Sequence, residues 1–77
     1  MTYLSKLIPG QCARVIGYTC DGPICRRLAE LGLTPGRKVM YLRDAPLKDP
    51  LQIQIGRGSL SLRHDQAALV LVEVEEQ

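Results

Sequence analysis

Three cysteines, Cys12, Cys20 and Cys25, are the side chains of this sequence best suited to metal or redox chemistry. Their spacing, C-x7-C-x4-C, lacks the C-x2-C pairs that prearrange a zinc site or an iron–sulfur cluster. A tetrahedral site would also need a ligand from a carboxylate or from His64, the single histidine. We therefore expect no metal site and no cofactor, and Cys20, Cys25 and His64 are the candidate ligands should transition-metal binding occur.

The number of cysteines also bears on the redox state of the protein. Three cysteines fit no fully paired disulfide framework, and the N-terminus has no apolar run of signal-peptide length. We predict reduced thiols in a reducing compartment, packed as small hydrophobic side chains. A redox role for Cys25 is kept as an alternative, because a helix start stabilises a thiolate.

Enzyme chemistry needs converging polar groups, and the sequence offers few of them. His64 lies in an Arg-His-Asp stretch where we expect solvent exposure, and Ser59 and Ser61 lack the turn that activates a nucleophilic serine. No phosphate-binding G-x4-G-K-[ST] motif occurs. We predict no catalytic residue and therefore no enzyme.

The charge pattern argues against nucleic acid as the main partner. The formal net charge is +2 and the aromatic content is 4%, with no Trp and no Phe. A small barrel that binds nucleic acid usually adds aromatic platforms to a concentrated positive charge. Nucleic-acid binding is kept as an alternative that would use the basic side chains Arg26, Arg27, Arg37, Lys38, Arg57 and Arg63.

At 77 residues the chain has room for a single domain, residues 1–77, with a mainly aliphatic core. No apolar run is long enough to span a membrane, so we expect a cytoplasmic protein. After a lead-in over residues 1–10, the patterns predict strands over 11–18, 37–43, 51–55, 60–63 and 69–74, a helix over 22–31 and a helical turn over 64–68. Five short antiparallel strands with one helix after the first strand favour a small closed or partly open β-barrel.

The stretch LAELGLTPG, residues 28–36, predicts where the helix ends and the next strand begins. Gly32 fits the left-handed residue of a Schellman cap, with Leu33 packing back on Leu28. Pro35 and Gly36 fit the corners of a type II turn. Because Leu-x-Pro-Gly also occurs at residues 7–10, we predict two equivalent strand entries; the structural turn residues are Gly10, Gly32, Pro35, Gly36, Gly56 and Gly58.

Other local predictions concern the helix start, the core and the last strand. Asp21 is expected to cap the helix and Pro23 to lie in its first turn. The final strand is rich in Leu and Val, so we expect burial on both of its faces. The predicted core comprises Val15, Ile24, Leu28, Leu31, Val39, Ile53, Ile55, Leu60, Leu62, Leu69, Leu71 and either Val70 or Val72.

The order of several motifs gives the sequence a resemblance to a known family. PG…RVIG, RRLAELGLTPG, APLKDP, IGRGSLSLR and AALVLVEV, from about Leu4 to Glu75, are similar to the FeoA family. The resemblance implies a barrel like that of Src-homology-3 (SH3) domains, related to the C-terminal domain of diphtheria-toxin-repressor-type regulators. The stretch Tyr18–Cys25, with its two thiols, departs from the family pattern.

The resemblance also implies a function and a partner. It implies a non-enzymatic accessory role in bacterial ferrous iron uptake, through contact with the GTPase-bearing ferrous iron transporter at the inner membrane. The residues suggest a contact face on the outer side of the helix, with Arg26, Arg27 and Glu30, and in the loop tip at Leu47, unless Leu47 folds back on the barrel. A thiol-based iron or redox sensor is a further alternative, and a homo-oligomer paired through a strand edge is not excluded.

Overall fold

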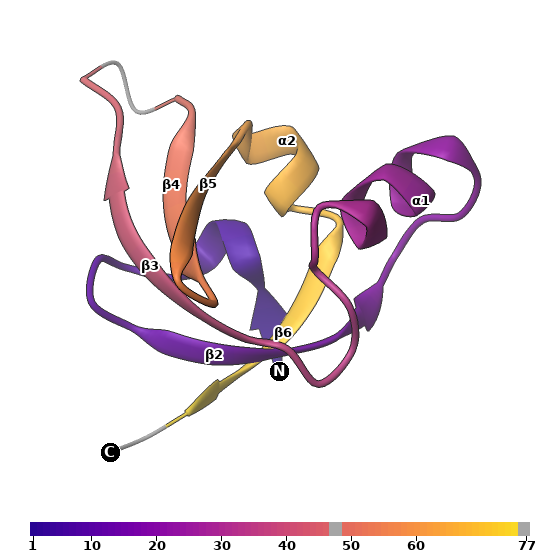
Figure 1. Ribbon diagram of the computed structural model, residues 1–77, viewed down its shortest axis with the longest axis horizontal. Coiled ribbons are helices and arrows are strands. Elements are labelled where there is room, and N and C mark those ends of the chain that lie inside the picture. Colours follow the sequence, from indigo (N-terminus) through magenta and orange to yellow (C-terminus); the bar gives the residue numbers. More distant parts are fainter. Residues whose placement is uncertain (47–48, 76–77) are drawn as a thin grey trace.

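The computed structural model describes residues 1–46 and 49–75, which form one curled antiparallel β-sheet with short helices beside it (Figure 1). Leu47, a predicted contact residue, lies outside the described residues. The elements in chain order are strand β1 (Thr2–Tyr3), the 3-10 helix η1 (Leu4–Lys6), β2 (Cys12–Tyr18), helix α1 (Pro23–Glu30), β3 (Lys38–Asp44), β4 (Leu51–Ile55), β5 (Gly58–Leu62), helix α2 (His64–Ala67) and β6 (Val70–Glu75).

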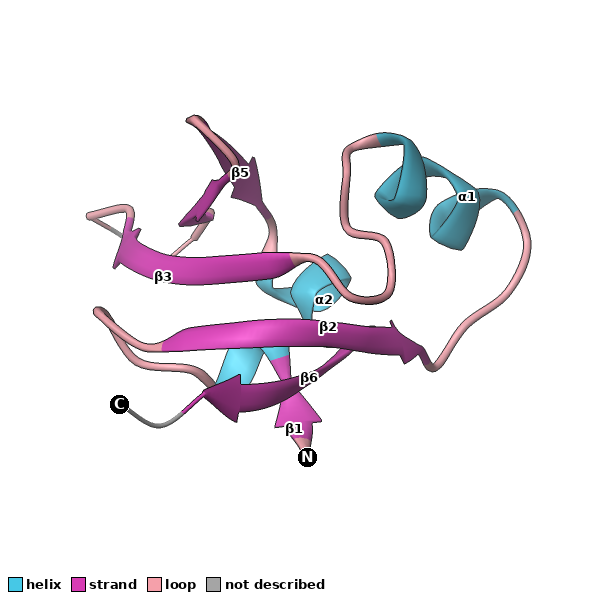
Figure 2. Ribbon diagram, turned by 60° about the horizontal axis from the view of Figure 1, so that its bottom comes forward, coloured by secondary structure: helices cyan, strands magenta, loops and turns pink. Residues whose placement is uncertain are grey.

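The sheet follows the order β1-β6-β2-β3-β4-β5. The predicted five strands, the inserted helix and the helical turn are all present, and the two-residue strand β1 adds a sixth within the described chain. β1 was not predicted from the sequence, because two residues are too few to show an alternation of apolar and polar side chains. Figure 2 shows α1 displaced to one side of the strands, beside the segment that leads into β3.

The two Leu-x-Pro-Gly turns lie at opposite ends of the β2–β3 pair and are bonded in the same way. The amide of Gly10 donates to the carbonyl of Tyr41 at 2.8 Å, and the amide of Gly36 donates to the carbonyl of Val15 at 2.8 Å. Both glycines have positive φ, of 92° and 91°, as the second corner of a type II turn requires. The prediction of two equivalent strand entries is confirmed.

Helix α1 ends as predicted but begins differently. At its end, Leu33 N–H donates to Leu28 C=O at 3.2 Å and Gly32 N–H donates to Ala29 C=O at 3.0 Å, which is the Schellman pattern. At its start, Gly22 and not Asp21 is the N-cap residue, with no side-chain hydrogen bond. The prediction for Asp21 was wrong because the helix starts one residue later than a cap at Asp21 requires.

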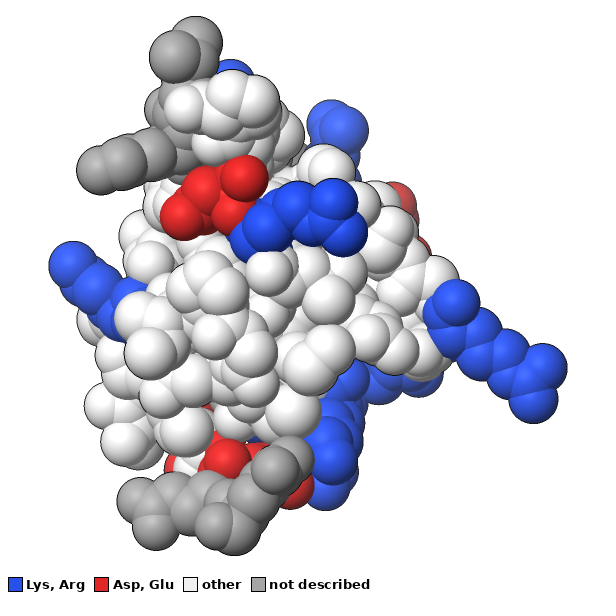
Figure 3. Space-filling model, turned by 90° about the vertical axis from the view of Figure 1, so that its left-hand side faces the viewer, with Lys and Arg blue, Asp and Glu red and all other residues white. Residues whose placement is uncertain are grey.

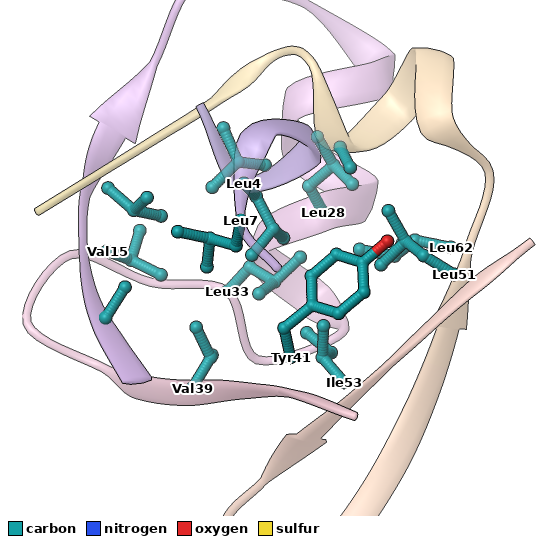
Figure 4. Packing of buried hydrophobic residues seen from close by; sticks show 14 residues of the cluster. Leu4, Leu7, Val15, Leu28, Leu33, Val39, Tyr41, Leu51, Ile53 and Leu62 are labelled. Carbon is teal, nitrogen blue, oxygen red and sulfur yellow. The ribbon is translucent and has the colours of Figure 1, made fainter. Parts of the chain in front are cut away.

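The core is an aliphatic cluster around the ring of Tyr41, whose hydroxyl points toward Leu51 and Leu62 (Figure 4). Many predicted core residues lie in or against this cluster, and Leu71 is half-buried. Sequence reasoning missed Leu4 and Leu7 of the lead-in, both of which are buried. Further buried residues that it missed are Ala13, Cys25, Leu33, Tyr41, Leu51 and Ala67.

Two predicted core residues of α1 and the predicted burial of β6 were wrong. Ile24 is 53% exposed and Leu31 is 39% exposed, because α1 buries the stripe through Cys25 and Leu28, and both lie on its border. In β6 the inward residues Val70 and Val72 are buried, whereas Glu73 is exposed. The face opposite Val70 and Val72 is only partly covered, because Leu71 on it is half-buried.

Candidate functional site

The outer face of α1 gathers exposed residues of two kinds. Arg26, Arg27 and Glu30 are exposed, as predicted, and the exposed Ile24 and Leu31 lie beside them. On a helix wheel these five residues follow one another around the side opposite Cys25 and Ala29. We call them the α1 outer face: two apolar side chains bordered by two cations and one carboxylate.

Both ends of α1 are tied to the end of β2. At the C-terminal end, the Tyr18 hydroxyl donates a short hydrogen bond to the carbonyl of Leu33. Burial of the Tyr18 phenol raises its pKa above the ordinary value. At the N-terminal end, Cys20 and Cys25 form a disulfide, with their Cα atoms 6.0 Å apart.

The disulfide corrects the prediction of reduced thiols for two of the three cysteines. The four residues between Cys20 and Cys25 turn the chain from β2 into α1 and bring the two Cα atoms within the usual disulfide range. Sequence spacing alone could not show this reversal. Cys12 is a free, half-buried thiol.

A polar cluster around His64 was missed by sequence reasoning. The His64 amide donates to Asp49 Oδ1 at 2.9 Å, and its ring contacts Asp49 Oδ1 through Nδ1 at 3.0 Å and Asp44 Oδ1 through Nε2 at 3.3 Å. Arg63 binds Asp49 Oδ2 at 2.9 Å, and the Tyr41 hydroxyl donates a short hydrogen bond to Asp44. The half-buried histidine therefore joins both ends of the loop after β3 to the start of α2.

The electrostatics of this cluster follow from its hydrogen bonds. The His64 ring and then the His64 amide hold the pKa of Asp49 below its ordinary value. Burial, followed by the bond to Asp44, raises the pKa of the Tyr41 phenol far above its ordinary value. The cluster brings no nucleophile beside a base, and its contacts hold the loop after β3 against the start of α2. We call this set of contacts the His64 clasp.

The candidate metal ligands are not brought together. Within residues 1–46 and 49–75, no group of three or more His, Cys, Asp or Glu side chains is placed to hold a metal ion. His64 contacts Asp44 and Asp49, whereas Cys20 and Cys25 are bonded to each other.

An open pocket of about 470 Å³ lies at the junction of β2, β3 and β4. Cys12 and Met40 face each other across β2 and β3, and Gln54 continues this row on β4. The pocket is lined by Cys12, Gly36, Arg37, Lys38, Val39, Met40, Gln54 and Gly56. Arg37 and Lys38 give its lining a positive charge, and it lies next to the tip of the β4–β5 hairpin.

The hairpin glycines and the basic side chains were also predicted from the sequence, and the structure gives their positions. Gly56 and Arg57 form the turn of the hairpin. The prediction of Gly58 as a turn residue was wrong, because Gly58 pairs with Ile55 and is the first residue of β5. On the side of the molecule seen in Figure 3, Lys and Arg form separate groups with uncharged surface between them. None of the helices in the described part of the chain is long and apolar enough to cross a membrane.

Comparison with known proteins gives the family. The FeoA domain model matches residues 2–74. A relative from Porphyromonas gingivalis, an Fe(2+) transport protein A/Fe(2+) transporter FeoB fusion protein, is 32% identical over 71 residues, which are 92% of this chain and 8% of the fusion protein. This chain therefore spans a small part of that relative.

Solved structures support the same assignment. FeoA of Stenotrophomonas maltophilia in complex with zinc, described as a prokaryotic SH3 domain protein, is similar with a TM-score of 0.80 and 31% identity over 95% of this chain and 91% of that chain. IdeR of T. acidophilum is similar with a TM-score of 0.77 and 28% identity, over 96% of this chain and 34% of that chain. The predicted SH3-like barrel and its relation to repressor domains are confirmed, and the chain belongs to the FeoA family.

Proposed function

We propose that this chain is a non-enzymatic accessory protein of bacterial ferrous iron uptake that binds the GTPase-bearing ferrous iron transporter through the α1 outer face. The observation that carries the proposal is the exposure of Ile24 and Leu31 on a helix whose opposite side is buried. Exposed apolar side chains bordered by arginines have the composition of a protein contact, in which apolar anchors are surrounded by a polar rim.

The family supports the choice of partner. In the relative from Porphyromonas gingivalis, the Fe(2+) transport protein A and the FeoB transporter are parts of one fusion protein. Fusion keeps two proteins at a high effective concentration, which is useful when they act together. We propose that the α1 outer face makes the contact between this chain and the transporter.

Affinity for the purified transporter tests the proposal. The ferrous transporter of the same host is immobilised in detergent, and binding of this chain is measured by biolayer interferometry. Ile24→Asp and Leu31→Asp should each weaken binding by roughly tenfold or more, because an apolar anchor is replaced by a charge. The double variant Arg26→Glu/Arg27→Glu should also weaken binding and change its salt dependence.

A matched charge control separates a local effect from a change in net charge. Lys6 and Arg43 are exposed and lie outside α1, so Lys6→Glu/Arg43→Glu makes the same change in net charge. This control should bind as the parent protein does. Equal binding by all variants, each shown by circular dichroism to be folded, would refute a contact through α1.

A further inference from the structure

We propose that the free edge of β5 binds an extended, acidic segment of a partner protein by β-strand addition. β5 is the last strand in the sheet order and pairs with β4 alone among the described strands. Both ribbon views show β5 at one end of the curled sheet (Figures 1 and 2). This site is separate from the α1 outer face, and the proposal does not depend on that surface.

The backbone of β5 has unused hydrogen-bonding groups along this edge. The two-residue turn Gly56-Arg57 places Ile55 opposite Gly58, so Leu60 and Leu62 direct their backbone groups toward β4. Ser59 and Ser61 consequently direct their N–H and C=O groups outward. Both serines are exposed, and no backbone bond joins them to another segment of the described chain.

The composition of β5 leaves this edge unprotected. Proteins usually block a free edge with a charged residue, a proline, a bulge or a very short strand. The other edge of the sheet, β1, has only two residues, whereas β5 is Gly-Ser-Leu-Ser-Leu with no charge and no proline. An edge of five residues without a blocking device is suited to pairing with another strand.

The flanking charges select an acidic partner and disfavour a second copy of this chain. Arg57 precedes β5, and Arg63, which also contacts Asp49 Oδ2 at 2.9 Å, follows it. A symmetric antiparallel pair centred on Leu60 would place each Arg57 opposite the second copy's Arg63, and like charges directly opposite each other are destabilising. An added strand with acidic residues at these two positions would have the opposite effect.

Leu60 defines the inner side of the added strand. It points toward the core, is half-buried and packs against the buried cluster. The residue opposite Leu60 would share its face and cover the exposed part of this side chain. The ligand is therefore an extended segment with apolar residues alternating toward the core and carboxylates opposite Arg57 and Arg63.

Titration with a designed peptide tests the proposal. The blocked peptide Glu-Val-Thr-Val-Thr-Val-Glu spans Arg57 to Arg63 in antiparallel pairing and places valine opposite Leu60. It is added to the ¹⁵N-labelled chain, and NMR chemical shifts and amide exchange are followed. The amides of Ser59 and Ser61 should exchange quickly in the free chain and become protected when the peptide is present. The same peptide with lysine at both ends should bind more weakly.

Two variants at one position provide a matched control. Ser61→Pro removes the outward N–H while leaving the bonds to β4, and a proline is tolerated on a strand edge. Ser61→Ala retains the N–H. Proline should weaken peptide binding on the order of tenfold or more, whereas alanine should leave it unchanged. If Ser61→Pro fails to fold, Arg57→Glu serves instead and should reverse the preference between the two peptides.

Several outcomes would overturn the proposal. Equal binding by Ser61→Pro and Ser61→Ala, or peptide shifts that map to α1, would place the peptide elsewhere. Protection of Ser59 and Ser61 that rises with protein concentration in the absence of peptide would show that a second copy occupies the edge. Because the transporter is absent from this experiment, its result is independent of the test of the α1 outer face.

Discussion

Gly32 combines a positive φ with a close neighbour on β4. Its φ is 104°, and a Cβ there would lie 3.2 Å from Cδ1 of Ile55. A β-branched side chain resists this backbone conformation and would also press on β4. We predict that Gly32→Val lowers the free energy of unfolding by about 1–3 kcal/mol, as measured by urea denaturation. Gly36 provides the comparison, because its φ is 91° but an added Cβ would meet no atom within 4 Å. Gly36→Val should therefore lower the free energy of unfolding less than Gly32→Val does.

Asp49 should make stability depend on pH. Because the pKa of Asp49 is held below its ordinary value in the folded chain, its contribution is present above the unfolded pKa and is lost as pH falls through the folded pKa. We predict that Asp49→Asn, compared with the parent by thermal melts at a series of acidic pH values, loses less stability on acidification. Parallel curves for parent and variant would contradict this account.

At the scale of elements, α1 is held to the barrel at few points. Cys25 and Leu28 are its buried side chains, and the disulfide and the Tyr18–Leu33 hydrogen bond secure its two ends. We predict that amides of α1 exchange with solvent at a lower opening free energy than those of β2 and β6. Reduction of the disulfide should speed exchange in α1 and leave β2 and β6 nearly unchanged. Uniform protection over all three elements would contradict this prediction.

The sequence predicted elements well wherever a local rule was sufficient. The alternation of residues 51–55 fixed β4, and Leu-x-Pro-Gly fixed both strand entries, because these patterns depend on nearest neighbours. The exposure of Ile24 and Leu31 was missed because helical periodicity does not show how wide a stripe the sheet can cover. The Cys20–Cys25 bond and the His64 clasp depend on chain reversals that spacing does not reveal.

The candidate sites also divide into those that a local pattern predicted and those that depend on contacts between distant residues. Exposure of Arg26, Arg27 and Glu30 followed from the helical pattern, since one side of a surface helix must face solvent. The free edge of β5 was not located, because the order of strands in a sheet depends on pairings between distant residues. Leu60 and the two serines became informative only when β4 was seen to be the single neighbour of β5 among the described strands.

At the scale of the whole molecule, stability rests on a small aliphatic cluster. Ile53 lies within this cluster and is fully buried. We predict that Ile53→Ala costs about 2–5 kcal/mol, because it removes buried groups and leaves a cavity. A domain of this size has on the order of 5 kcal/mol of total stability, so the variant should be partly unfolded at room temperature by near-ultraviolet circular dichroism. Ile24→Ala, at an exposed position, should change stability far less.

The paired turns at Gly10 and Gly36 have a consequence for how the length of this chain can vary. The Gly10 turn, which precedes β2, is bonded to β3, and the Gly36 turn, which precedes β3, is bonded to β2. These two hydrogen bonds fix the register between β2 and β3 at both ends of the paired segment. Inserting a residue into either strand would displace one turn from its partner and reverse the facing of the residues beyond it. Segments outside these two bonded turns, such as residues 19–22, do not have their length fixed by these bonds. Homologous chains should therefore differ in length in such segments and keep constant the spacing from Gly10 to Val15 and from Gly36 to Tyr41.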